Sequence, residues 1–121
     1  MPMIEFRYMR DKISDEDAFV IGRKLEDLLR DAVAQIRPNN RNYGVTVEGD
    51  PFRPIAFNQP SLRVYVFYHQ EWNFTADELK RLADALAANV EQTLRGVGLI
   101  ELETKIRFYA RAGHASATIL W

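Results

Sequence analysis

The chain has 121 residues, with 16 Lys and Arg, 17 Asp and Glu, two His and no Cys. That length suits a single domain, residues 1–121, and a composition that is 47% hydrophobic and 27% charged excludes a disordered chain. A net charge of −1 argues against nucleic-acid binding by bulk electrostatics, and the lack of Cys excludes disulfides, thiolate nucleophiles and Cys-based metal sites.

No stretch of the sequence suits a membrane or an export signal. The N-terminus MPMIEFRYMRD lacks a basic leader and an apolar run, and nowhere do about 18 apolar residues follow one another. We therefore expect a cytoplasmic protein that binds neither membrane nor nucleic acid. Two histidines, His69 and His114, are too few for a histidine-rich metal centre, so we expect no metal and no cofactor.

The first half begins with a strand and continues with an amphipathic helix. Residues 4–8 (IEFRY) alternate between apolar and charged side chains, which is typical of a strand with one buried face. After the N-cap Ser14, apolar residues recur every three or four positions, and this spacing predicts a helix that ends near Arg37. A second strand is predicted at 44–48 (GVTVE).

A proline-rich connection, 49–61 (GDPFRPIAFNQPS), follows the first half. We expect a short strand within it at Ile55–Phe57. At the other end of the chain, the tail 113–121 (GHASATILW) finishes on three large apolar residues. Such an end favours packing, with a neighbouring subunit as one candidate partner.

The second half repeats the pattern of the first. Residues 62–69 (LRVYVFYH) are β-branched and aromatic, as in a strand. Thr75 begins a capping box (TADE), and the apolar spacing that follows predicts a helix that stops near Gly96. A last strand is predicted at 104–110 (TKIRFYA).

An offset of 61 positions relates the two halves. It separates the two N-caps, Ser14 and Thr75, and it superimposes the apolar faces of the helices. The matched pairs are Ala18 with Leu79, Ile21 with Leu82, Leu25 with Leu86, Leu29 with Val90 and Val33 with Leu94. We interpret this as two β-α-β pseudo-repeats, about 2–60 and 61–121. They predict an α+β fold with a four-stranded mixed sheet and two helices on one face.

The sheet face opposite the helices is expected to be polar. It would carry Glu5 and Arg7 on the first strand, with Lys105, Arg107 and Tyr109 on the last. A face of this kind needs solvent or a partner. Either an oligomer that lines a central channel with these residues or a ligand-binding sheet face would satisfy it.

Pro2 is the residue with the most chemical content. Removal of Met1 would leave a secondary amine at the chain end, and apolar surroundings or nearby cations would lower the pKa of that amine. A neutral amine can then act as a general base. The structural interpretation of Pro2 is a strand-start proline, where the missing N–H costs nothing.

The whole pattern resembles the tautomerase superfamily of the macrophage migration inhibitory factor type. The likeness rests on the opening PMIEFRYM, on Lys12 followed by SDED, on Arg37-Pro38 after the first helix, and on YGVTVEGDPFRPIAF. It spans nearly the whole chain as a pattern of elements. No Gly-rich turn follows Phe57, and no aromatic residue of the tail aligns with the pocket aromatics of the family.

The resemblance implies a homotrimer whose sheets surround a channel, with Pro2 at a subunit boundary. It makes Pro2 the base that moves a proton within a small enol or keto carboxylate. Lys12 and Arg37 become candidate binders of the substrate carboxylate. Lys105 and Arg107 fall on a strand that supplies pocket residues, although the family has uncharged residues there.

Two classes of function remain open. The first is a cofactor-independent, tautomerase-like isomerase. The second is a non-catalytic ligand-binding or assembly protein of the same fold, or of a ferredoxin-like β-α-β-β-α-β fold, which would form a monomer or dimer instead of a ring.

Overall fold

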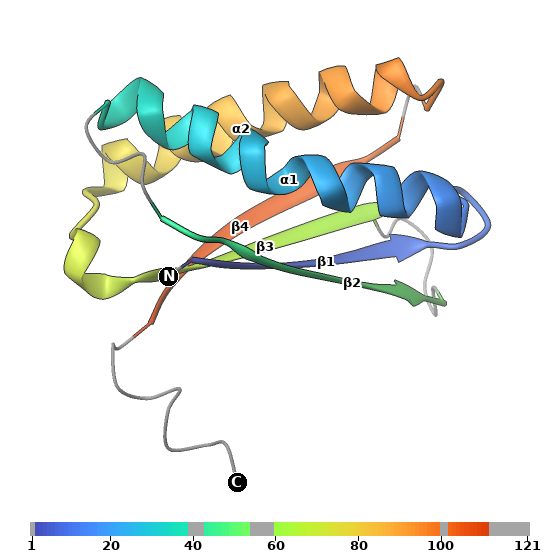
Figure 1. Cartoon of the computed structure of the whole chain (residues 1–121), viewed down its shortest axis with the longest axis horizontal. Coiled ribbons are helices and arrows are strands. Elements are labelled where there is room, and N and C mark those ends of the chain that lie inside the picture. The colour runs from blue at the N-terminus through green and yellow to red at the C-terminus, as the bar shows by residue number, and fades with distance from the viewer. Residues whose placement is uncertain (1, 39–42, 54–59, 100–101, 112–121) are drawn as a thin grey trace, which may run out of the picture.

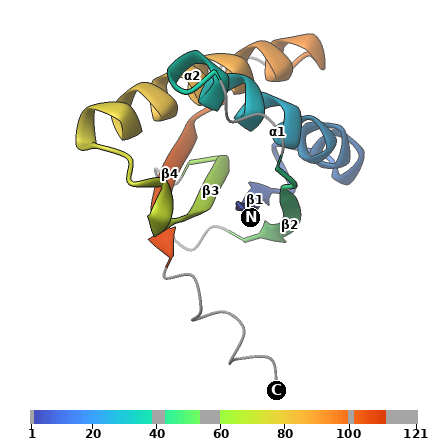
Figure 2. The ribbon, with the colours of Figure 1, turned by 60° about the vertical axis from the view of Figure 1, so that its left-hand side comes forward.

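The computed structural model describes residues 2–38, 43–53, 60–99 and 102–111 of the chain. Two helices lie side by side over one face of a four-stranded sheet (Figures 1 and 2). The elements in chain order are β1 (Met3–Met9), α1 (Asp15–Ile36), β2 (Thr46–Phe52), β3 (Leu62–His69), the 3-10 helix η1 (Gln70–Trp72), α2 (Ala76–Gly96) and β4 (Thr104–Arg111). The α+β fold and the arrangement of helices and strands predicted from the sequence are confirmed.

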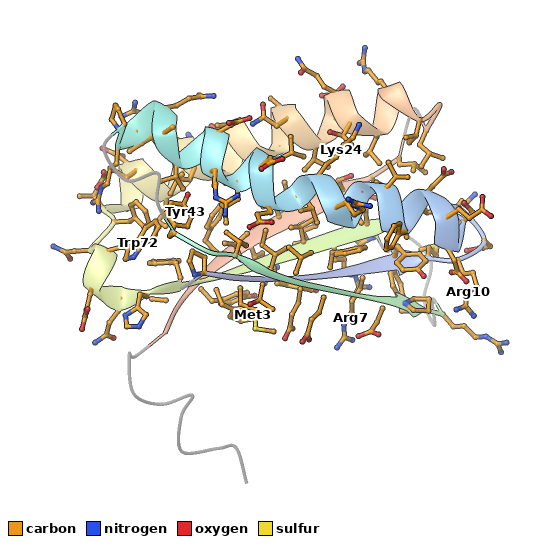
Figure 3. The ribbon with its side chains drawn as sticks, viewed as in Figure 1. Met3, Arg7, Arg10, Lys24, Tyr43 and Trp72 are labelled. Carbon is orange, nitrogen blue, oxygen red and sulfur yellow. The ribbon has the colours of Figure 1, made fainter. Side chains whose placement is uncertain are left out.

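The sheet has the strand order β2-β1-β3-β4. β1 pairs in parallel with β2 and antiparallel with β3, and β3 pairs in parallel with β4. The two first strands of the β-α-β units therefore lie at the centre of the sheet, and β2 and β4 form its edges. Met3 and Arg7 of β1 point away from the helices, as Figure 3 shows.

Local hydrogen bonds explain where the helices begin and end. Ser14 caps α1 by accepting from the Asp17 N–H at 3.1 Å. Thr75 and Glu78 form a reciprocal capping box on α2, with hydrogen bonds of 3.0 and 3.1 Å. Acidic residues follow both caps, where the helix dipole favours them. At the other end of α1, the Arg37 N–H donates to the Val33 carbonyl.

One buried layer joins the helices to the sheet. The helix residues in this layer have the apolar spacing seen in the sequence, and each of them is at most 3% exposed. They are Ala18, Ile21, Leu25, Leu29, Ala32 and Val33 on α1, and Leu82, Leu86, Val90 and Leu94 on α2. β3 alternates buried and half-buried residues over its whole length, as expected for a central strand with one face under the helices.

β2 differs from its predicted position. The prediction placed a strand at 44–48, whereas β2 runs from Thr46 to Phe52. β2 extends past its predicted end because its residues 50–52 still pair with residues 7–9 of β1. Pro51 is tolerated because β2 is an edge strand, where a missing N–H need not break a ladder on both sides.

Two further predictions fall outside the described residues. They are the short strand at Ile55–Phe57 and the packing of the apolar tail, 113–121. Among the residues that the structure describes, neither helix is long and apolar enough to cross a membrane.

Candidate active site

Pro2 lies directly before β1, on the helix-covered side of the sheet. Its ring is less than 2% exposed, and its carbonyl accepts from the Thr46 N–H at 3.2 Å, which joins the start of β1 to the start of β2. The side chains around it are almost all apolar: Leu29, Val33, Val66, Tyr68, Trp72, Phe74, Leu82 and Phe108. The cavity they enclose with Pro2 is about 10 Å³, close to the smallest volume that holds one water.

Arg37 lies at the same end of the molecule as Pro2. Its guanidinium stands 4.4 Å above the Phe74 ring, and Phe74 also lines the Pro2 cavity. It forms a two-pronged salt bridge with Glu78, at 3.1 and 3.2 Å, and donates to the carbonyls of Trp72 and Asn73. Arg37 thus joins the end of α1 to the start of α2.

The contact with Arg37 lowers the pKa of the Glu78 carboxyl. The Arg37 guanidinium, followed by the Thr75 N–H, holds the pKa of the Glu78 carboxyl below its usual value of 4.5. Both side chains of the ion pair are about one quarter exposed. The predicted carboxylate binder Arg37 therefore already holds a carboxylate, and that carboxylate belongs to the protein.

Lys12 lies at the far end of β1 from Pro2. It follows the strand in an exposed turn, where its N–H donates to the Met9 carbonyl at 2.9 Å. β1 has seven residues, which at the usual rise per residue is roughly 23 Å. Within one chain, Lys12 and Pro2 are consequently too far apart to bind the same small molecule.

Lys105 and Arg107 lie on the opposite side of the sheet from the Pro2 ring. Their neighbours on β4, Ile106 and Phe108, pack against the buried layer, so alternation along the strand turns Lys105 and Arg107 away from it. Both are exposed. Of the four predicted ligand-binding cations, only Arg37 is brought close to Pro2 within one chain.

His69 is half-buried at the end of β3. Its Nδ1 lies 3.9 Å from a Glu71 carboxylate oxygen and has no hydrogen-bond partner among the described residues. The turn η1 that follows was not predicted, and it places Trp72 beside Pro2. Within the described ranges, no group of three or more His, Asp and Glu side chains is arranged to hold a metal ion.

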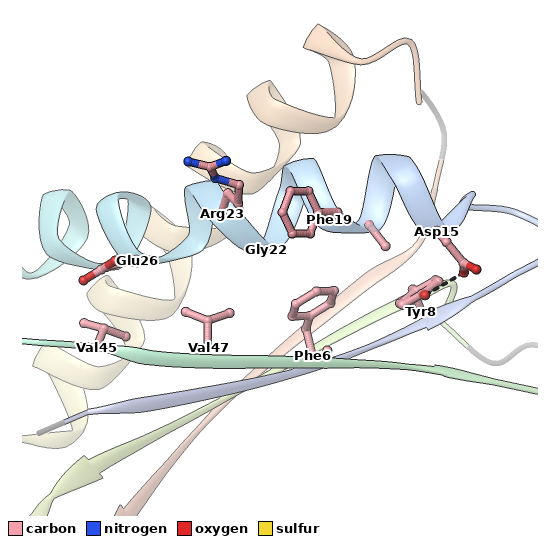
Figure 4. Close-up of a pocket in the computed structure, with 11 residues that line it drawn as sticks. Phe6, Tyr8, Asp15, Phe19, Gly22, Arg23, Glu26, Val45 and Val47 are labelled. Atoms are coloured by element: carbon pink, nitrogen blue, oxygen red, sulfur yellow. Dashed lines mark hydrogen bonds between the residues drawn. The ribbon is translucent and has the colours of Figure 1, made fainter.

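A groove of about 530 Å³ is a feature that the sequence analysis missed. It runs between α1 and the edge strand β2 (Figure 4). Phe6 forms its floor, and Gly22 and Gly49 make room for the ring, since a Cβ at either glycine would come closer than 3.0 Å to it. Phe19, 65% exposed, stands at its rim. Two glycines facing one aromatic residue across two elements leave no periodic signal in a sequence.

A small polar cluster closes one end of this groove. The Tyr8 hydroxyl donates to an Asp15 carboxylate oxygen at 2.7 Å, and Arg10 donates to the same oxygen at 3.1 Å. The hydrogen bond from Tyr8 is the main cause that lowers the pKa of Asp15, and the same bond raises the pKa of Tyr8. The cluster fixes the turn between β1 and α1.

Comparisons with known proteins identify the fold. No protein-family model matches the chain, and no curated protein sequence matches it either. Solved structures match over nearly its whole length, and they include members of the tautomerase superfamily. The chain therefore has the fold of that superfamily, and at the sequence identities found the likeness establishes the fold alone.

Three of the similar structures show the extent of the match. One of them, named MIF2 and from Leishmania major, is 14% identical with a TM-score of 0.59, covering 92% of this chain and 89% of that one. A 5-carboxymethyl-2-hydroxymuconate delta-isomerase is 15% identical with a TM-score of 0.59, covering 93% and 83%. A fused 4-OT, described as a symmetric trimer, is 14% identical with a TM-score of 0.59, covering 93% and 87%.

Proposed function

We propose that the protein is a tautomerase-like isomerase that moves a proton within a small enol or keto carboxylate, with Pro2 as the base. The observation that supports this most is the place of Pro2. It stands at the very start of β1 among apolar side chains, and one of these, Phe74, also lies under the Arg37 guanidinium.

These surroundings suit a prolyl amine that works as a base. A chain-terminal amine ordinarily titrates near pH 8, and both burial and a nearby cation lower its pKa further, because both disfavour the charged form. Once Met1 is removed, the neutral nitrogen accepts a proton from a carbon beside the substrate carbonyl and returns it at a second position. A chain that retains Met1 has an amide there and no basic nitrogen.

A homotrimer would bring the remaining cations to such a site. Lys12 is roughly 23 Å from Pro2 along β1, and Lys105 and Arg107 lie on the other sheet face. All three can join Pro2 only from a neighbouring copy. A similar structure that is described as a symmetric trimer supports this assembly.

A non-catalytic ligand-binding or assembly protein is the second candidate. Two observations favour it: the Pro2 ring is less than 2% exposed beside a cavity of about 10 Å³, and Arg37 is already paired with Glu78. On this alternative, Pro2 only begins a strand and Arg37 only joins two helices.

Mass spectrometry and enzyme assays test the two candidates. Intact mass first establishes whether Met1 is absent from the purified protein, and turnover of phenylpyruvate and 2-hydroxymuconate is then measured. We expect Pro2→Ala to lower kcat/KM by roughly 100-fold or more, as removal of a general base does. Pro51→Ala, at an exposed proline of β2, is the matched control and should retain activity. Retained Met1 with no turnover would favour the non-catalytic candidate, whereas full activity in Pro2→Ala would overturn the role of Pro2 as the base.

A further inference from the structure

The groove between α1 and β2 is separate from the cavity beside Pro2. Its volume of about 530 Å³ lies within the roughly 300–1,000 Å³ typical of sites for small molecules. Among the described residues, the groove and the Pro2 cavity have no lining residue in common, and none of the four cations predicted to bind substrate lines the groove. A ligand in this groove would therefore be additional to the substrate of the proposed function.

A comparison of the two pseudo-repeats shows that the outer surface of α1 beside the groove is unusually apolar. Phe19 and Val20 of α1 are 65% and 36% exposed. The offset of 61 positions places Lys80 and Arg81 at the corresponding positions of α2, where both are exposed. The second half thus presents charged side chains where the first half presents apolar ones. Exposed apolar surface beside a groove is typical of a binding site.

The groove is elongated and apolar in its middle. Figure 4 shows its lining as two rows, with Phe19 and Arg23 on α1 above Phe6 and Val47 on the strands. Asp15 begins the α1 row, and the helix rises by roughly 12 Å from Asp15 to Arg23 at the usual 1.5 Å per residue. A medium-length alkyl chain can lie extended along a groove of this shape.

Arg23 is the cation at one end of the apolar stretch. It is exposed, its guanidinium lies 5.8 Å from the centroid of the Phe19 ring, and within the described ranges it has no salt bridge of 4.0 Å or less. An Arg guanidinium offers two parallel N–H donors that match the two oxygens of a carboxylate. Arg23 is therefore suited to bind a carboxylate whose apolar part contacts the neighbouring Phe19 ring.

The two acidic side chains that line the groove already have cationic partners. A Glu26 carboxylate oxygen lies 2.6 Å from an Arg30 nitrogen, and an Asp15 oxygen lies 3.1 Å from the Arg10 Nε. Among the described residues that line the groove, Arg23 is thus the charged group without a salt-bridge partner. Electrostatic complementarity then favours an anionic ligand over a cationic one.

We infer that the groove binds a free medium-chain alkyl carboxylate, with its head group on Arg23 and its chain between Phe19 and the strands. Such a ligand would cover the exposed Phe19 side chain, which explains why an aromatic residue stands where α2 has Lys80. The inference goes beyond the proposed function, because it uses a different cavity and none of the residues assigned to the chemistry at Pro2.

Calorimetric titration with carboxylates of different chain length tests the class of ligand. Octanoate, hexanoate and butyrate are each added to the full chain below the concentrations at which they form micelles. We expect the affinity to fall by about two- to fourfold for each methylene removed, as burial of methylenes predicts. Octylamine should bind about fivefold more weakly than octanoate, because its ammonium group repels Arg23. Equal binding of the amine, or an affinity that does not depend on chain length, would overturn the inference.

Matched variants on the two helices test the location of the site. Phe19→Ala and Arg23→Gln should each weaken octanoate binding by about fivefold, since each removes one of the two contacts of the ligand with α1. Lys80→Ala and Arg81→Gln, on the exposed face of α2, are the controls and should leave the affinity unchanged. All four side chains are exposed, so the variants are expected to fold. Equal losses from both helices would contradict a site on α1.

Amide NMR spectra separate this inference from the proposed function. Octanoate should shift the resonances of Gly22 and Gly49, which line the groove, and Pro2→Ala should leave its affinity unchanged. Shifts confined to Trp72 and Phe74, beside Pro2, would overturn the inference while the proposed function stands. Wild type that binds no octanoate would overturn it as well. Shifts at the two glycines in a protein that does not turn over phenylpyruvate or 2-hydroxymuconate would support the inference and count against the proposed function.

Discussion

On the helix-covered face of the sheet, Ile4, Val64 and Val66 are no more than 1% exposed, and each meets apolar neighbours from the same chain. On the open face, one position away along the same strands, Glu5 and Arg63 alternate with them and have no salt bridge within the described ranges. The first face is completed by folding. The second is not covered by any element of the same chain among the described residues, so the stability of the single chain is expected to depend on the first face far more than on the second.

The two faces of β1 provide the most direct way to break this comparison. We expect Ile4→Ala to lower the free energy of unfolding by about 2–5 kcal/mol, because it removes buried methyl and methylene groups and leaves a cavity. Glu5→Ala, on the next residue and the opposite face, should change it by about 0.5 kcal/mol or less. Urea denaturation of both variants measures the contrast. Equal losses would mean that the open face contributes to the fold of the single chain.

Gly49 tests how closely the covered face is packed at the sheet edge. Because a Cβ there would come closer than 3.0 Å to three atoms of the Phe6 ring, Gly49→Ala should cost about 1–3 kcal/mol through displacement of Phe6. Gly96→Ala is the matched control: no atom lies within 4 Å of its Cβ position, at the end of α2. The midpoint of denaturation should fall for the first variant only, and an equal fall in both would contradict the close packing of Phe6.

The Arg37–Glu78 contact is expected to give a smaller, pH-dependent effect. The pKa of Glu78 is lower in the folded chain than its usual 4.5, so its pairing stabilises the fold above that value and is lost as the pH falls through the folded pKa. Wild type should therefore be more stable than Glu78→Gln at pH 7, and the difference should shrink as the pH falls below 4.5. Glu91→Gln, in an exposed pair with Arg95, is the control with little expected effect at either pH. A difference for Glu78→Gln that does not change with pH would contradict the ionic role of the pair.

Sequence patterns predicted the elements well where one local rule applied. Ser14 and the Thr75 capping box marked the starts of α1 and α2, and the three-and-four spacing selected residues such as Leu25 and Leu86 for the buried layer. Sequence patterns were less successful in placing β2, because the end of that strand depends on its pairing with β1 and not on its own composition. The groove over Phe6 was missed because it needs Gly22 and Gly49 to face one ring from two elements.

The amino-acid sequence by itself determined the order of helices and strands and the side chains that face the core, because caps and apolar periodicity act within a few neighbouring residues. Only the tertiary structure decided which candidate site residues are neighbours. Strand order and register place Arg37 near Pro2, put Lys12 at the other end of β1, and turn Lys105 and Arg107 to the open face. These positions follow from pairings between segments that are far apart along the chain, and no local sequence pattern specifies such pairings.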